Sequence, residues 1–229
     1  MWKTLLKIFA VLVICVVGFF YVSFFGLPWK KVTVANELAQ YVEKKYTIGV
    51  DVKDRYYNFK DGSYGAIFVE PTQQIEFTVE KISNDNISDY YAEAVWVQQV
   101  TVDTAPIIEK SFPSFTVKEP FVSPVYGIGN DLTVTKDIPN YRDVNTMVSL
   151  ILRFEEKRTK EIEELLVTEL FAFIQALQQA GIENVGITVY LDEEESPEQK
   201  SETFSISFEG HDLKNIHSEQ QLQKFINIF

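Results

Sequence analysis

The side chains best suited to metal binding or acid–base chemistry are the two histidines, His211 and His217. A helical zinc site places its two histidines at positions i and i+4, and this spacing is wider. The only cysteine, Cys15, lies inside an apolar run, so neither a disulfide nor a cysteine-based metal site can form within one chain. The sequence therefore predicts surface histidines without a catalytic or metal-binding role.

Nucleophile and phosphate motifs are equally weak. No serine stands in the Gly-x-Ser-x-Gly context of a nucleophile elbow. The two glycines of the segment Gly127-Ile128-Gly129-Asn130-Asp131 are similar to those of a phosphate-binding loop, but the segment lacks a third glycine and a lysine. We interpret this segment as a turn.

A cluster of acidic residues could bind Ca²⁺ through carboxylate oxygens. It comprises Asp192, Glu193, Glu194 and Glu195, followed by Ser196-Pro197 and Glu198. The spacing does not match an EF-hand loop. The interpretation we favour is a solvated hairpin loop.

Five aromatic residues gather in one stretch and could line a groove for an apolar ligand or a peptide. They are Tyr56, Tyr57, Phe59, Tyr64 and Phe68. Aromatic side chains on strands more often fill a core, and that is the interpretation we favour. The sequence thus predicts no catalytic, cofactor-binding or metal-binding residue, and the chain is not expected to be an enzyme.

The N-terminus carries an uninterrupted apolar run, with no charged residue from Ile8 to Trp29. Roughly 20 helical residues cover the ~30 Å hydrocarbon core of a bilayer. A cleaved signal peptide would have a shorter apolar region and small residues at the cleavage site, where Phe24, Phe25 and Leu27 stand instead. We expect residues 1–29 to be an uncleaved transmembrane anchor that contacts the lipid bilayer through residues 8–29.

The side of the membrane is encoded less clearly, because Lys3 and Lys7 precede the apolar run and Lys30 and Lys31 follow it. We expect a single-pass protein of the cell membrane with the N-terminus inside and the C-terminal region outside the cytoplasm. Lipid attachment at Cys15 is disfavoured, since bulky rather than small residues precede it.

The formal net charge is −12, and all 33 acidic residues follow Leu27. Such a surface repels phosphate backbones, so nucleic acid is excluded as a partner. Hydrophobic residues make up 46% of the chain, which is typical of a folded protein.

After the anchor, residues 32–111 are predicted to form an N-terminal α+β domain in the order α-β-β-β-α. Apolar spacing favours a helix over 34–46, and alternation favours antiparallel strands over 50–59, 64–69 and 74–80. Ser88 or Asp89 can cap a helix that runs to Lys110, although its valines favour a strand and Pro106 would kink or end it.

Residues 112–139 hold half of the 8 prolines and predict a Pro/Gly-rich connection. Residues 140–229 then read as a C-terminal α+β domain in the order β-α-β-β-α, with a long helix that ends at Gly181 and a final helix that begins near Ser218. The predicted fold class is α+β, with a transmembrane helix followed by two small units whose sheets are antiparallel or mixed.

The segment from Tyr57 to Ala66 (YNFKDGSYGA), followed by Ile87-Ser88-Asp89-Tyr90-Tyr91, resembles the YfjL-like proteins. These are small membrane-anchored or lipid-anchored proteins of low-GC Gram-positive bacteria. The resemblance covers about residues 34–111, and the second half is similar to the family's C-terminal domain in a less specific way. It implies a location at the cell surface and a helix over 88–110, and it carries no biochemical activity to this chain.

The absence of a nucleophile, base or metal cluster favours a non-enzymatic binding or accessory module with a protein partner at the cell envelope and no cofactor. One alternative is a membrane-anchored hydrolase that uses two carboxylates across a cleft. The other is a regulatory or sensor protein, for which only a short segment would remain inside the cell.

Overall fold

The computed structural model describes residues 2–83, 86–118, 120–129, 137–144, 148–192 and 204–228. Contacts divide the chain into two units. The first comprises Met1–Ala92 and Gly129–Asp137, and the second comprises Glu93–Ile128 and Ile138–Phe229. Each unit is described by itself below.

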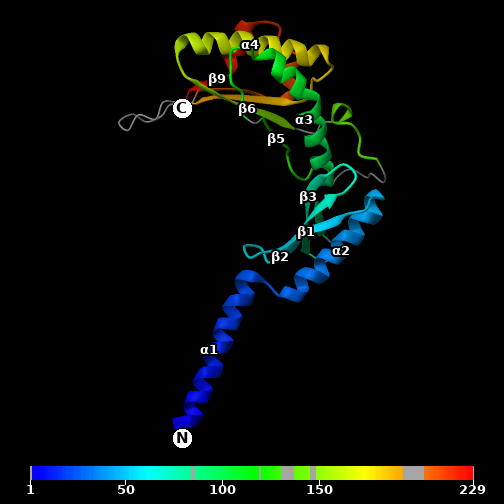
Figure 1. Cartoon of the computed structure of the whole chain (residues 1–229), viewed down its shortest axis with the longest axis vertical. Helices are drawn as coiled ribbons and strands as arrows, with labels where there is room; N and C mark the ends of the chain where they lie inside the picture. Colours follow the sequence, from blue (N-terminus) through cyan, green and yellow to red (C-terminus); the bar gives the residue numbers. More distant parts are fainter. Residues whose placement is uncertain are drawn as a thin grey trace. The chain divides into compact units, whose positions relative to one another are not determined.

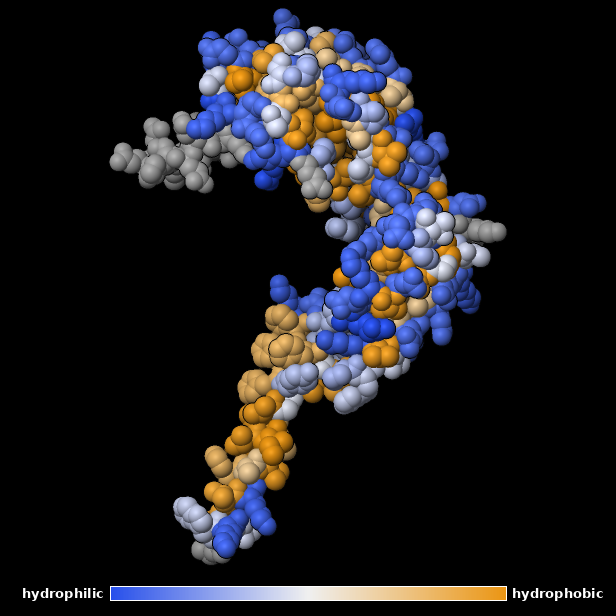
Figure 2. Space-filling model, in the orientation of Figure 1, coloured by the Kyte–Doolittle hydropathy of each residue, from blue (hydrophilic) through white to orange (hydrophobic). Residues whose placement is uncertain are grey.

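The first unit begins with α1 (Trp2–Phe25), a helix with no buried residue. Among the described residues it begins the one helical stretch long and apolar enough to cross a membrane. Apolar side chains cover most of its length (Figure 2). The helix ends at Gly26, whose positive φ of 67° suits glycine, and α2 (Pro28–Tyr46) follows with proline in its first turn.

Four antiparallel strands follow α2 in the order β1-β2-β3-β4, and the alternation of the sequence predicts the first three (Figure 1). They are β1 (Asp51–Asn58), β2 (Ser63–Glu70), β3 (Ile75–Ser83) and β4 (Asn86–Asp89). One face of this sheet packs against α2, where Leu38, Ala66 and Phe68 are fully buried. A sheet covered by one helix is a standard two-layer solution for burying an apolar face.

A buried carboxylate joins α2 to β4. Asp89 is fully buried and accepts hydrogen bonds from Tyr46, from Tyr41 Oη at 3.0 Å and from Lys45 Nζ at 2.7 Å. Burial opposes the charged form of Lys45, yet the hydrogen bond and the charge of Asp89 raise its pKa above the usual value. Lys45 therefore stays charged, and its ion pair with Asp89 fixes the helix on the sheet.

Helix α3 (Tyr91–Ser111) runs through Pro106 without ending. Its valines favour a strand by propensity, but Val95, Trp96 and Val100 are buried at helical spacing, so packing decides the structure. The predicted helix is confirmed, and it begins after Asp89 because residues 86–89 pair with β3.

The second unit holds a five-stranded sheet in the order β5-β6-β7-β8-β9. Its strands are β5 (Phe121–Ser123), β6 (Ser149–Lys157), β7 (Gly186–Asp192), β8 (Phe204–Phe208) and β9 (Ile226–Ile228). Only β6 and β7 are parallel, because α4 (Lys160–Gln179) connects them as a crossover. The sheet is therefore mixed.

Helix α4 covers one face of this sheet (Figure 1). Thr159 caps its first turn by accepting a hydrogen bond from Ile162 N at 3.2 Å, and Glu161 and Glu163 favour the positive end of the helix dipole. The buried stripe is Leu166, Leu170, Phe173, Ile174 and Leu177. On the sheet, the buried side chains of β6 are Leu150, Leu152 and Phe154, and Val148 just before the strand is also buried.

The predicted α+β class, with an apolar N-terminal helix and antiparallel and mixed sheets, is confirmed. The short strands β4, β5 and β9 were not predicted. The predicted final helix is only a turn, α6 (Glu219–Leu222), followed by a 3-10 turn, η3 (Gln223–Phe225), and by β9. The domain bounds expected at 111 and 139 differ from the division inside α3, between Ala92 and Glu93.

Candidate functional site

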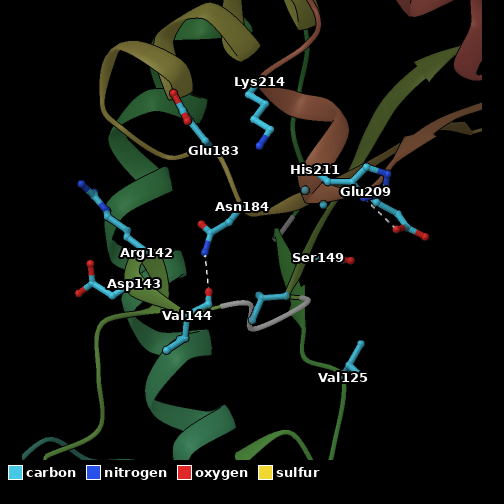
Figure 3. Close-up of a pocket in the computed structure, with 13 residues that line it drawn as sticks. Val125, Arg142, Asp143, Val144, Ser149, Glu183, Asn184, Glu209, His211 and Lys214 are labelled. Carbon is cyan, nitrogen blue, oxygen red and sulfur yellow. Dashed lines mark hydrogen bonds and ion pairs between the residues drawn. The ribbon is translucent and has the colours of Figure 1, made fainter.

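A cavity of about 440 Å³ opens in the second unit, near the first residues of β6 and β7 (Figure 3). Its walls come from three places: the 3-10 turn η2 (Tyr141–Asp143), the loop between α4 and β7, and the short helix α5 (Gly210–Leu213). The lining residues are Val125, Arg142, Asp143, Val144, Val148, Ser149, Glu183, Asn184, Gly186, Glu209, Gly210, His211 and Lys214.

Hydrogen bonds to neighbouring elements fix the η2 wall. The hydroxyl of buried Tyr141 donates to Asp103 Oδ2 at 3.0 Å, and its backbone N–H donates to Gln99 Oε1 at 3.0 Å. Arg142 donates to the same Asp103 carboxylate at 2.7 Å and to the carbonyl of Ala180, just after α4, at 3.0 Å. The wall is thereby held by both α3 and the end of α4.

Asn184 closes the floor of the cavity. Its side-chain amide donates to the carbonyl oxygens of Tyr141 and Val144, the latter at 2.9 Å. Both bonds require the NH₂ group, so the orientation of the amide is fixed. The other end, Oδ1, is buried and has no hydrogen-bond partner in the part of the chain that the structure describes. A buried acceptor without a donor costs about 1–3 kcal/mol, so such groups call for an explanation.

Two glycines let the walls approach closely. A Cβ on Gly186 would stand 2.8 Å from Ser149 Oγ, and a Cβ on Gly210 would stand 2.5 Å from the backbone of Asn184. Any larger residue at position 210 would have to displace main chain. Both positions therefore shape the cavity through the absence of a side chain.

Charges of both signs line the cavity, and some of them are already paired. Arg142 pairs with Asp103, and His211 lies 3.2 Å from Glu209 and 3.6 Å from Asp212. Lys214 and Glu183 are exposed and have no ion-pair partner among the described residues. Figure 3 shows the side chain of Lys214 extending toward Asn184. These two groups are available to a ligand that carries both charges.

The arrangement offers little for catalysis. In Figure 3 the carboxylates of Asp143 and Glu209 point to opposite sides rather than across the cavity at each other. Burial raises the pKa of Tyr141 to about 12, and its hydrogen bond to Asp103 adds to the effect, so the hydroxyl stays protonated as a donor. Within the described ranges, no group of three or more His, Cys, Asp or Glu side chains could hold a metal ion.

The residues singled out in the sequence fall in different places. His211 lines the cavity and is exposed, whereas His217 lies elsewhere and its backbone N–H donates to Gln221. Gly127 lies in a turn with a φ of 96° and donates to buried Glu93, while Asn130 and Asp131 lie outside the described residues. The acidic cluster after Asp192 also lies outside them.

The aromatic stretch splits between core and surface. Phe68 and Tyr64 are buried in the first unit, as a core role predicts. Tyr56 lies on Gly65 and Tyr57 on Gly26, where an added Cβ would meet each ring within 2.6 Å. Phe59 is 54% exposed, so the core interpretation is wrong for this residue.

Sequence reasoning missed the cavity residues Arg142, Asp143, Glu183, Asn184 and Lys214. Each is an ordinary polar residue in a loop or turn, and no spacing connects them. They meet because η2, the α4–β7 loop and α5 end at the same edge of the sheet. The local sequence signal for η2 is Asn140, a capping residue whose side chain accepts a hydrogen bond from Arg142 N at 3.0 Å.

The first unit is a small α+β domain that follows an apolar helix. In a comparison with protein families, residues 1–94 match the YfjL-like, N-terminal domain. This part of the chain therefore carries a YfjL-like N-terminal domain, which confirms the resemblance predicted from the sequence, over 1–94 rather than 34–111. A search of the curated proteins and a search of the solved structures each found no match.

Proposed function

We propose that the chain is a membrane-tethered, non-enzymatic binding module, and that the cavity of the second unit receives a segment of a protein partner at the cell envelope. The observation that carries the proposal is a pair of exposed charges in the wall of the cavity, because Lys214 and Glu183 have no ion-pair partner among the described residues. A ligand that carries both charges can pair with both side chains.

The remaining lining groups favour a polypeptide as that ligand. Lys214 and Glu183 complement a chain of mixed charge, and Val125, Val144 and Val148 give the cavity an apolar side. Just before Val125 lies β5, an edge strand of the described sheet, with Phe121 exposed. An extended segment beside an edge strand obtains backbone hydrogen bonds and places alternate side chains in pockets.

The tether is supported by α1, an apolar helix in which none of the described residues is buried. We propose that α1 spans the cell membrane once and that both units lie outside the cytoplasm. The acidic net charge of −12 fits a module that does not bind nucleic acid.

The experiment is crosslinking on intact cells, followed by identification of what copurifies, with protease accessibility scored on the same sample. We expect added protease to digest the two units on intact cells and one protein to copurify with the wild-type chain. The matched variant Glu183→Lys/Lys214→Glu keeps the net charge, reverses both free charges and should lose the partner. Protection of the units from protease would place them inside, and turnover of a substrate by the purified protein would contradict a non-enzymatic role.

A further inference from the structure

The junction between α1 and α2 carries exposed apolar side chains outside the membrane helix itself. Trp29 is 68% exposed, Phe59 is 54% exposed, Ile82 is 52% exposed and Val32 is 49% exposed. Trp29 and Val32 share one face of the first turn of α2, since residues three apart are neighbours on a helix. Singly exposed apolar residues need no explanation, but these gather around the end of α1.

Three contacts hold this junction together. The Phe59 ring lies 5.6 Å from the Phe24 ring of α1. The backbone N–H of Leu27 donates to Tyr64 Oη at 3.0 Å, and Gly26 is buried against Tyr57. The turn between β1 and β2 is therefore fixed on the last turn of the apolar helix.

These contacts fix the depth of the turn between β1 and β2 relative to the bilayer. If α1 spans the bilayer, its last turn lies at the boundary between hydrocarbon and headgroups. Phe59 contacts Phe24 and is therefore held at the same boundary, where aromatic residues are favoured. Trp29 follows the helix end by one turn and lies at headgroup level.

Unpaired cations surround these apolar side chains, although the chain as a whole is acidic. Lys30, Lys31 and Lys60 have no ion-pair partner in the described part of the chain. A cavity of about 320 Å³ opens beside Lys30, also lined by Thr33, Glu37, Lys81, Ile82 and Ser83. Its acid, Glu37, pairs with Lys81 at 2.7 Å, so it does not oppose an anion near Lys30.

Two other acids lie nearby, Asp61 and Glu80, and both contact Ser63 Oγ. Asp61 also accepts a hydrogen bond from Ser63 N at 3.1 Å, inside its own turn. The bonds from Ser63 lower the pKa of Asp61, so its charge is fixed, but the three lysines without an ion-pair partner outnumber the two acids. The local balance at the junction is positive.

We propose that this junction, comprising Trp29, Lys30, Lys31, Phe59 and Lys60, is a second membrane contact that binds the phosphates of anionic lipid headgroups. The inference rests on the proposed tether. The aromatic rings enter the interface while the lysines meet the phosphates, each lysine near an anionic surface adding about fivefold to the contact. The contact fixes the orientation of the first unit relative to the membrane, whereas a single helix would leave the unit free to rotate.

The test is hydrogen exchange measured by mass spectrometry on the full chain in nanodiscs, with phosphatidylcholine alone or mixed with phosphatidylglycerol. We expect the amides of the 58–62 turn to exchange at least fivefold more slowly with phosphatidylglycerol present. The variant Lys31→Gln/Lys60→Gln should lose this difference, because it removes two free charges and leaves Lys30 on the Tyr64 ring. The control Lys44→Gln/Lys53→Gln removes two lysines away from the junction and should keep it.

The two proposals fail in different ways. Rapid exchange of the α1 amides in both nanodiscs would contradict the tether. Slow exchange in α1, together with turn amides that respond neither to phosphatidylglycerol nor to Lys31→Gln/Lys60→Gln, would overturn the lipid contact and leave the tether intact.

Discussion

In the first unit, the buried carboxylates of Asp89 and Glu70 accept hydrogen bonds from groups of the same unit. In the second unit, the buried amide oxygen of Asn184 has no donor among the described residues and belongs to the wall of a cavity. Both units use buried polar groups to fix their elements, but the second unit also has a cavity lined by the exposed charges Lys214 and Glu183, which have no ion-pair partner among the described residues. On this difference rests our proposal that the first unit holds the protein at the membrane and the second unit binds the partner.

The family match follows the same division. It ends at residue 94, just beyond Ala92, where the contacts pass from the first unit to the second. The matched domain thus contains the apolar helix, the four-stranded sheet and the buried ion pair. The cavity lies outside the matched residues.

The largest effect is expected from Asp89→Ala in the first unit. Removing this carboxylate takes the ion-pair partner from partly buried Lys45 and one hydrogen-bond acceptor from each of the Tyr41 and Tyr46 hydroxyls. We expect a loss of about 3–5 kcal/mol in the stability of the first unit. Denaturant unfolding with hydrogen exchange measures it, and Asp51→Asn, at the exposed start of β1, is the control. A loss below 1 kcal/mol would show that the pair does not fix α2.

A smaller effect is expected from Asn184→Ala in the second unit. The substitution removes two hydrogen bonds and leaves the carbonyls of Tyr141 and Val144 unpaired, but it also removes the unpaired Oδ1. We expect a loss of about 1–2 kcal/mol, read as faster exchange in residues 139–144. An unchanged exchange rate there would mean that Asn184 does not hold the wall.

The next effect depends on pH. Burial opposes the charge of Glu70, but the backbone N–H groups of Thr72 and Gln73 outweigh it and lower the pKa below 4.5. A lowered pKa stabilises the fold above pH 4.5, and this contribution is lost as the pH falls through the folded value. Glu70→Gln should therefore cost about 1–2 kcal/mol at pH 7 and make the first unit less sensitive to acid. Equal acid sensitivity in thermal melts of both proteins would count against this.

The smallest effect on stability is expected at the free charges of the cavity. Lys214→Ala and Glu183→Ala should each change stability by less than about 0.5 kcal/mol, because both side chains are exposed and unpaired among the described residues. Each should nevertheless weaken the partner complex, measured by crosslinking yield on cells. A large stability loss with an unchanged yield would assign these residues to the fold rather than to binding.

Local patterns predict the elements that contain enough residues to show a period. The alternation over residues 75–80 predicts β3, and the apolar stripe that ends before Gly181 predicts α4. The three-residue strands β5 and β9 exist only because a neighbouring strand pairs with them. Strand β4 was missed because Asn86, Ser88 and Asp89 have the composition of a turn or a helix cap.

The cavity could not be predicted because its walls depend on contacts between distant residues. Asp103 and Arg142 meet across 39 positions, and Asn184 reaches Val144 across 40. The exposure of Phe59 was not predicted for a similar reason. Its spacing suits a core strand, but the ring lies in the turn after β1 and contacts the end of α1.

The most direct test of the binding role is site-specific photocrosslinking on intact cells. A photoreactive residue at position 183 lies in the cavity of the second unit, and one at position 44 lies on the exposed side of α2 in the first unit. We predict one discrete crosslinked protein from position 183, lost when Lys214→Glu is added, and none from position 44. The same crosslinked protein from both positions, or none from position 183, would contradict the account.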